Sequence, residues 1–135
     1  MSRPLLFDTS VWIDFLNKKD TPQARLLEAY IEADDGVLLT PTILQEILQG
    51  IRDDKKYFEI KEALSYFTLL DLPPKRAAIG SAELFRFLRK KGVTIRKSND
   101  CLIAYYAVSH AVTIVHTDRD FDKIGQHSDL QVWKQ

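Results

Sequence analysis

The sequence predicts an α/β fold with an open, parallel central sheet of four to five strands and helices on both faces. Short apolar runs typical of buried strands alternate along the chain with longer segments of helical periodicity. Such alternation favours a parallel sheet, because each helix carries the chain back to the edge where the next strand begins. The 135 residues predict a single domain, residues 1–135, that is large enough to bury its own core.

The amino-terminal quarter of the chain predicts one strand and two helices. Residues 4–8 form a short apolar strand, and Ser10 can cap the helix that follows and runs through Asn17. Thr21 precedes a proline and therefore caps a second helix, because proline is favoured at the first helical position. This helix is expected to run toward Asp34, with Gly36 stopping it.

The middle of the chain continues the alternation. Residues 37–39 are a second strand, and Thr40 before a proline caps a third helix. The apolar stripe of that helix consists of Ile43, Leu44, Ile47, Leu48 and Ile51. A further helix is predicted over residues 53–65, and a third strand over residues 66–72.

The last part of the chain predicts two more helices and two more strands. A proline pair begins a long helix that ends at Gly92, and Ser98 can cap the next helix. In that helix the run 101–108 is apolar all round, which indicates burial on more than one side. Residues 112–117 form a fourth strand and residues 130–133 a weak fifth.

Acidic side chains stand where the predicted strands end. Asp8 closes the first strand, and Asp118 and Asp120 follow the fourth. Asp100 lies in the first turn of the most apolar helix, whereas the helical phase of Glu46 permits an approach to the same edge without requiring it. Because open parallel sheets bind ligands at the carboxyl ends of their strands, these acids are candidates for one site. Taken alone, Asp100 is more simply explained as a helix cap.

Carboxylates that converge on one crevice repel one another, and a hard divalent cation held by oxygen atoms relieves that repulsion. Mg²⁺ fits this donor set and Mn²⁺ can substitute, whereas zinc is disfavoured because no His or Cys stands at ligand spacing. We expect His110, His116 and His127 at the surface or at helix ends. A cation with open positions suits phosphoryl chemistry, because it activates water and neutralises charge that develops on phosphate.

At these residues the sequence resembles the PIN-domain ribonucleases and, within them, the small VapC-like toxins of prokaryotic type II toxin–antitoxin pairs. The resemblance covers essentially the whole chain. Four motifs carry it, in order: LLFDTSVWIDFL with Asp8, LTPTILQEILQG with Glu46, SNDCLIAYYA with Asp100, and VHTDRDFDKI with Asp118. Each motif is weak alone, but the four together at this spacing are specific.

The resemblance implies a three-layer fold with strand order 3-2-1-4-5 and a metal-dependent endoribonuclease that hydrolyses RNA phosphodiester bonds. Family members hold Mg²⁺ or Mn²⁺ mainly through the acids that match Asp8 and Asp100. The rest of the implied catalytic set is Glu46 and Asp118, with Asp120 and Ser10 as accessory candidates. The resemblance also implies a cognate small antitoxin that neutralises the toxin, and a homodimer.

A basic run leads into Asp100, with six basic and no acidic residues between Leu84 and Asn99. We expect it to track RNA phosphates, with a solvated helix face as the plain alternative. The candidate RNA-binding residues are Arg86, Arg89, Lys90, Arg96 and Lys97. Apolar side chains on two helices exceed what one core face needs, so some are expected to face a partner: Trp12, Ile13, Phe15, Leu16, Tyr57 and Phe58.

Composition bounds the class of protein. Nineteen basic and nineteen acidic residues cancel, so a polyanion such as RNA must be attracted by a local patch. The lone Cys101 cannot form an internal disulfide, which favours a reducing compartment. No apolar run is long enough for a signal peptide or a membrane span, so we expect a cytoplasmic protein that does not associate with membranes.

Three alternatives remain open from the sequence. A non-toxin RNA-processing enzyme or a structure-specific DNA nuclease of the same fold would carry the same acids. A receiver-like signalling domain needs paired acids after the first strand and a phosphoacceptor after the third, but Asp8 stands alone and Asp71 precedes a proline pair. A non-catalytic binding module of this fold would not require the acid set.

Overall fold

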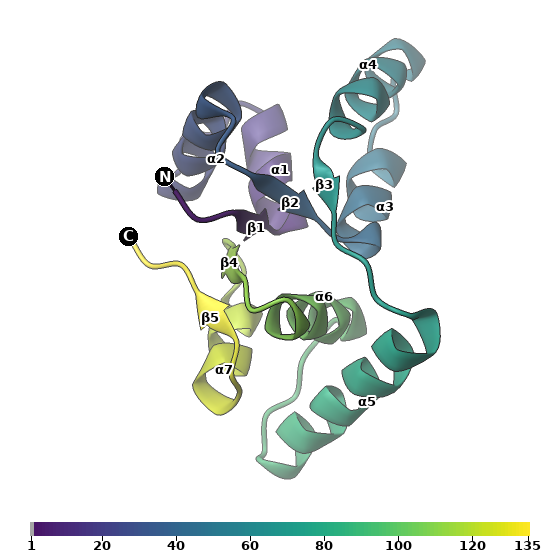
Figure 1. Ribbon diagram of the computed structural model, residues 1–135, viewed down its shortest axis with the longest axis vertical. Helices are drawn as coiled ribbons and strands as arrows, with labels where there is room; N and C mark the ends of the chain where they lie inside the picture. Colours follow the sequence, from purple (N-terminus) through teal and green to yellow (C-terminus); the bar gives the residue numbers. More distant parts are fainter. Residues whose placement is uncertain (1) are drawn as a thin grey trace.

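The computed structural model describes residues 2–135 and shows a five-stranded parallel sheet surrounded by helices (Figure 1). The strands are β1 (Leu5–Phe7), β2 (Val37–Leu39), β3 (Thr68–Leu69), β4 (Thr113–Val115) and β5 (Gln131–Val132). Their order in the sheet is β3-β2-β1-β4-β5, and Leu6 at the centre lies opposite both Leu38 and Ile114. The predicted α/β class and the strand order implied by the resemblance are confirmed.

Seven helices connect these strands within residues 2–135. They are α1 (Thr9–Leu16), α2 (Pro22–Ala33), α3 (Pro41–Gln49), α4 (Asp54–Leu64), α5 (Pro74–Lys90), α6 (Ser98–Ser109) and α7 (Arg119–His127). Figure 1 shows α1 to α4 gathered beside β1 to β3, α6 and α7 beside β4 and β5, and α5 on the outer side of α6. The chain therefore winds outward in one direction from β1 and in the other from β4, which makes the β1–β4 boundary the topological switch point of the sheet.

Two threonine caps form as predicted. The hydroxyl of Thr21 accepts a hydrogen bond from the Ala24 N–H at 3.0 Å, and that of Thr40 accepts one from Ile43 at 3.1 Å. Each satisfies a backbone N–H that has no partner within its helix, and proline at the next position adds a favourable φ angle.

Other helix boundaries differ from the prediction. Asp8, and not Ser10, caps α1, because its carboxylate accepts the Ser10 N–H. The end of α2, by contrast, agrees with the prediction, because Asp34 is its C-cap in the left-handed conformation (φ 53°). Lys97, and not Ser98, is the N-cap of α6, and no side chain caps that helix. α7 was not predicted, because its nine residues carry few apolar side chains.

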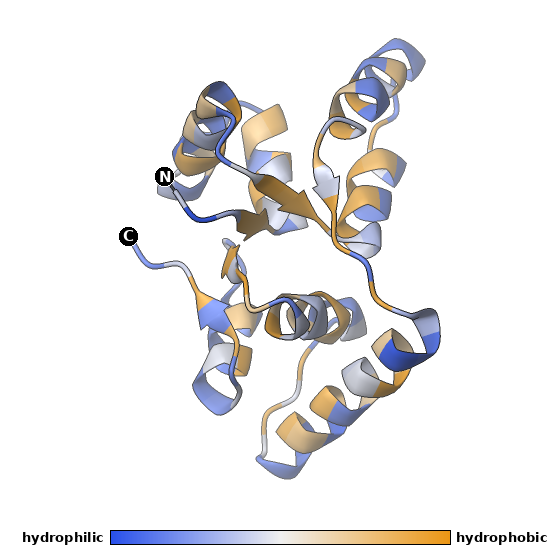
Figure 2. Cartoon of the chain, viewed as in Figure 1, coloured by the Kyte–Doolittle hydropathy of each residue, from blue (hydrophilic) through white to orange (hydrophobic). Residues whose placement is uncertain are grey.

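The core lies around the strands and α6. Figure 2 shows β1 and β2 as strongly apolar, with hydrophilic residues on the outer turns of the helices. α6 packs against α3, α5, α7 and β4, which confirms burial on more than one side. Of the side chains expected to face a partner, Trp12 is only 2% exposed, whereas Ile13 and Phe58 are 47% and 63% exposed. No helix in residues 2–135 combines the length and apolarity needed to span a membrane.

The packing of α5 on α6 depends on Gly80. A Cβ atom at Gly80 would lie only 2.1 Å from the ring of Tyr105 on α6, whose hydroxyl accepts a hydrogen bond from Arg76 Nε at 3.4 Å. We expect Gly80→Ala to lower the unfolding free energy by about 1–3 kcal/mol, the usual cost of overpacking. Urea denaturation measures this difference.

The control tests whether the ring is the cause. In a Tyr105→Ala background, Gly80→Ala should become neutral or stabilise by up to about 1 kcal/mol, since alanine is the better helix former. Gly50→Ala should be tolerated in the native background, because its nearest neighbours would lie 3.5 Å or more from the new Cβ. An equal effect of Gly80→Ala in both backgrounds would contradict this account.

Candidate active site

The site begins at the switch point between β1 and β4. Asp8 directly follows β1, and its N–H donates to the Val115 carbonyl at the end of β4 at 2.9 Å. Asp118 follows β4 after His116 and Thr117. Parallel pairing of β1 with β4 therefore brings both acids to the same edge of the sheet, as the sequence predicted.

Ser10 holds the Asp8 carboxylate and joins the two strand ends. Its Oγ donates to Asp8 Oδ2 at 2.7 Å and accepts the Thr117 N–H at 3.1 Å, while its own N–H donates to the same Asp8 oxygen at 3.1 Å. Burial raises the pKa of Asp8 above its ordinary value, and the negative charge of Glu46 adds to the rise, although the hydrogen bonds from Ser10 oppose it.

Thr9 brings Glu46 into the site. The buried Thr9 hydroxyl donates to Glu46 Oε1 at 2.8 Å and so links the start of α1 to α3. Helical phase left the direction of Glu46 open, and this tertiary hydrogen bond decides it. A pocket of about 320 Å³ results, lined by Asp8, Thr9, Ser10, Ile13, Glu46, Gln49, Lys97, Asp100 and Asp118.

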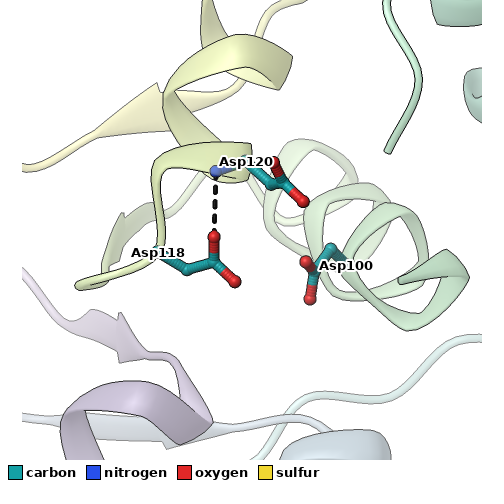
Figure 3. Close-up of side chains that lie close together, drawn as sticks. All are labelled: Asp100, Asp118 and Asp120. Carbon is teal, nitrogen blue, oxygen red and sulfur yellow. Dashed lines mark hydrogen bonds between the residues drawn. The ribbon is translucent and has the colours of Figure 1, made fainter. Parts of the chain in front are cut away.

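Three carboxylates form the tightest acidic group. One oxygen from each of Asp100, Asp118 and Asp120 lies within 4.8 Å of the other two, and Figure 3 shows the side chains turned toward a common space from α6 and from the start of α7. Asp118 caps α7 by accepting the Asp120 N–H at 3.0 Å. Asp120 is thus a full member of this group, whereas the sequence offered it only as an accessory candidate.

Asp100 is a buried carboxylate that makes no ion pair in residues 2–135, and the charge of Lys97 only partly opposes the rise of its pKa. Asp100 is 6% exposed, and its Oδ2 has no hydrogen-bond partner in the described part of the chain. Burial raises the pKa of Asp100 to about 7, with further contributions from the charges of Asp8 and Asp118. Because Asp100 is not the N-cap of α6, the simpler interpretation of this residue as a helix cap is wrong.

Arg96 compensates the other two acids of the group. Its Nη2 lies 3.2 Å from Asp118 Oδ1 and its Nε lies 3.1 Å from Asp120 Oδ2, while Lys123 Nζ lies 3.6 Å from Asp120 Oδ1. Burial alone would raise the pKa of Asp120, but the hydrogen bonds and charge of Arg96 outweigh it and keep that pKa below its usual value.

His116 orients the backbone that carries Asp118. Its Nδ1 accepts the Asp118 N–H at 3.0 Å, so its Nε2 bears the ring proton and donates to Asp122 Oδ1 at 3.0 Å. The prediction of a surface or helix-end position is wrong for His116, which is 8% exposed, and correct for His110 and His127. The one feature of the sequence that indicates the His116–Asp122 pair is a histidine after an apolar strand with an acid six residues later.

The charges of the site divide into two halves, and this division bears on metal binding. Asp118 and Asp120 have Arg96, whereas no ion pair reaches Asp8 or Asp100 in residues 2–135. Buried carboxylates with raised pKa values and an orphaned oxygen are costly unless a cation joins them. An all-oxygen donor set of this kind fits Mg²⁺ or Mn²⁺.

The predicted RNA-binding residues separate in space. Lys97 lines the acidic pocket, and Arg96 is engaged with Asp118 and Asp120. Arg86, Arg89 and Lys90 are exposed on the last turns of α5. The basic residues therefore do not form one continuous basic surface, because Arg96 forms ion pairs with Asp118 and Asp120.

Comparisons with known proteins agree on one family. The PIN domain model matches residues 5–126. Ribonuclease VapC11 of Mycobacterium tuberculosis and VapC ribonuclease Mb1587 of Mycobacterium bovis are each 30% identical over 94% of this chain and 96% of their own length.

Solved structures support the same fold at lower identity. VapBC2 from Rickettsia felis, bound to a DNA fragment from its promoter, aligns with a TM-score of 0.74, 19% identity, and coverage of 96% of this chain and 98% of that one. VapBC-1 from nontypeable Haemophilus influenzae aligns with a TM-score of 0.72, 18% identity, and 96% coverage of both chains.

The uncompensated Asp100 predicts an unusual dependence of stability on pH. In metal-free protein the folded chain retains the Asp100 proton up to about pH 7, whereas the unfolded chain loses it near its ordinary pKa of 3.8. This contribution to stability is therefore present below about pH 4 and is lost as the pH rises through about 7. Urea unfolding in chelator across this range measures the loss.

Asp100→Asn should remove that contribution. The variant cannot ionise, so at about pH 8 its metal-free unfolding free energy should exceed that of wild type by about 1 kcal/mol or more, since one pKa unit corresponds to about 1.4 kcal/mol. Asp14→Asn on α1 is the matched control and should follow the wild-type profile. If the unfolding free energy of Asp100→Asn changed with pH in parallel with that of wild type, the pKa of Asp100 would not be raised in the folded chain.

Proposed function

The chain belongs to the PIN-domain family, and we propose that it is a metal-dependent endoribonuclease that hydrolyses RNA phosphodiester bonds as the toxin of a toxin–antitoxin pair. One observation carries the chemistry: the buried carboxylates of Asp8 and Asp100 meet at the switch point without a protein cation bonded to either. The ribonuclease names of the relatives that match 94% of the chain support RNA over DNA as substrate.

We propose Mg²⁺ as the cofactor, with Mn²⁺ as a substitute, held mainly by Asp8 and Asp100. When bound, the cation activates a water for attack on phosphorus and neutralises charge on the phosphate. Ser10 fixes the orientation of Asp8. Glu46, held by Thr9 at the rim of the pocket, is our candidate to accept the proton of the attacking water.

The remaining acids have a supporting role in this proposal. Asp118 lines the pocket and completes the catalytic set, while Asp120 holds Arg96 beside it. Because the catalytic set supplies both the nucleophilic water and its base, a ribose 2′-hydroxyl is not required as the nucleophile. The enzyme would therefore leave the 2′-hydroxyl intact.

The partners follow from the same family. We propose a cognate small antitoxin that neutralises this chain, supported by the VapBC structures, because VapBC is a family of toxin–antitoxin systems. We also propose a homodimer that acts in the cytoplasm, where its RNA substrate lies. Ile13, which is 47% exposed beside the pocket, is an apolar contact that such an antitoxin could cover. RNA would be held by Lys97 at the pocket and by Arg86, Arg89 and Lys90 on α5.

Two substitutions test the catalytic proposal. Asp8→Asn and Asp100→Asn should each reduce RNA hydrolysis by about 100-fold or more, because a neutral amide oxygen replaces a charged metal ligand. Both should abolish toxicity when the chain is expressed without an antitoxin. Cleavage of a labelled RNA in Mg²⁺ measures the rates, and single-stranded DNA of the same sequence tests the alternative substrate.

Asp14→Asn, outside the pocket, should retain wild-type cleavage and serves as the charge-matched control. Chelation should abolish wild-type cleavage, and added Mg²⁺ or Mn²⁺ should restore it. Full activity of the Asp8 and Asp100 variants, or of wild type in chelator, would disprove the mechanism. Faster cleavage of DNA than of RNA would favour the DNA nuclease.

A second test concerns the α5 basic residues. Changing Arg86, Arg89 and Lys90 together to Gln should weaken RNA binding and flatten its salt dependence. On single-stranded RNA, each lost phosphate contact should lower the slope of log K against log salt by about 0.7. Fluorescence anisotropy from about 50 to 300 mM salt measures the slope. An unchanged affinity and slope would identify this part of α5 as a solvated surface.

A further inference from the structure

The acidic group of Asp100, Asp118 and Asp120 raises the question of how many cations the site takes. The three carboxylates lie within 4.8 Å of one another, close enough to share an ion beside one held by Asp8 and Asp100. Carboxylate sites that act on phosphodiesters use either one or two metal ions. The position of Arg96 bears directly on this choice.

Arg96 bonds one oxygen of each acid that a second ion would need. The other oxygen of Asp120, Oδ1, has no hydrogen-bond partner in the described residues, and its nearest cation is Lys123 Nζ at 3.6 Å. The guanidinium of Arg96 bonds Asp118 Oδ1 through Nη2 at 3.2 Å and Asp120 Oδ2 through Nε at 3.1 Å, and its backbone N–H also approaches Asp120 Oδ2 at 3.4 Å. The adjacent Ile95 is 3% exposed and fixes the segment from which Arg96 extends. The planar donors of arginine thus bridge two carboxylates, which a lysine ammonium cannot do with the same fixed geometry.

Asp120 requires a positive charge in any state of the enzyme. Its side chain is fully buried, and its charged partners are Arg96 and Lys123. Arg96 and Lys123 supply that charge from within the chain, so Asp120 is compensated without an ion from solution. Asp8 and Asp100 lack such a partner and remain available.

We propose that Arg96 takes the place of a second metal ion, so that the site binds one divalent cation and uses the guanidinium as its second, fixed positive charge. This inference rests on the proposed function, because it assigns the cation to Asp8 and Asp100. Arg96 is then a positioning residue that holds Asp118 toward the pocket. Arg96 is therefore not an RNA-binding residue, although its place in the basic run predicted that role.

Counting bound Mn²⁺ tests the proposal. The full chain, freed of metal by chelation and dialysis, is titrated with Mn²⁺, and the bound fraction is followed by calorimetry and by the electron paramagnetic resonance signal of free Mn²⁺. Wild type should bind one Mn²⁺ per chain. Arg96→Gln should bind two, the second more weakly, because Asp118 and Asp120 have lost their guanidinium.

Two further variants locate the effect. Arg119→Gln removes one positive charge next to the same acids, but Arg119 makes no ion pair within residues 2–135, so this control should still bind one Mn²⁺. Arg96→Gln combined with Asp120→Asn should return to one ion, because the second site has lost a ligand. A purely structural role for Arg96 would not raise the number of bound ions in any variant.

The outcomes separate this inference from the proposed function. Two Mn²⁺ per wild-type chain, or magnetic coupling between two bound Mn²⁺ ions in wild type, would overturn the role of Arg96 while leaving metal-dependent cleavage intact. One Mn²⁺ in both wild type and folded Arg96→Gln would also overturn it. No Mn²⁺ binding by wild type would overturn the proposed function itself. Two Mn²⁺ bound by wild type would overturn the inference even if Arg96→Gln did not fold.

Discussion

Negative charge buried between the ends of β1 and β4 is the constraint around which this structure is organised. The direction of winding reverses between β1 and β4, which leaves a crevice outside the carboxyl ends of these two strands. The chain places acids where the two strands end. Ser10 joins those ends by bonding both Asp8 and the Thr117 backbone, and Thr9 draws Glu46 in from α3. The central strands thus set the position of the site, and polar contacts of the first helical turn set its shape.

The two halves of this charge are stabilised in different ways. Arg96 is bonded to Asp118 and Asp120, so the negative charge of these two acids is compensated by the protein itself. Asp8 and Asp100 depend on a proton or on a cation, as their raised pKa values indicate. A ligand that binds only the folded state stabilises it by mass action, so we expect the proposed cation to raise folding stability through Asp8 and Asp100.

Sequence reasoning reached the parts of the site that local patterns encode. Asp8 and Asp118 follow apolar strands, and Asp100 stands out in an apolar helix, so strand ends and hydropathy were sufficient to single them out. Glu46 needed the family resemblance, because the Thr9 hydrogen bond that orients it spans 37 residues. The sequence shows the basic run that contains Arg96, but it does not predict the ion pairs of Arg96, because its two acidic partners lie 22 and 24 residues away. The polar composition of α7 similarly hid a helix that its Asp118 cap defines.

An acidic pocket that must admit RNA needs positive charge nearby, and the net charge of zero means that the charge has to be local. Arg96 reduces the repulsion from within by compensating two of the acids, and Lys97 beside it faces the same pocket without an ion-pair partner in residues 2–135. Adjacent residues in one basic run therefore differ in role, because Arg96 compensates acids and Lys97 does not form an ion pair in residues 2–135. In the proposed function, Arg96 limits how strongly the pocket repels a phosphate. Lys97 is then our candidate to contact that phosphate, and the exposed end of α5 is our candidate for the remaining attraction.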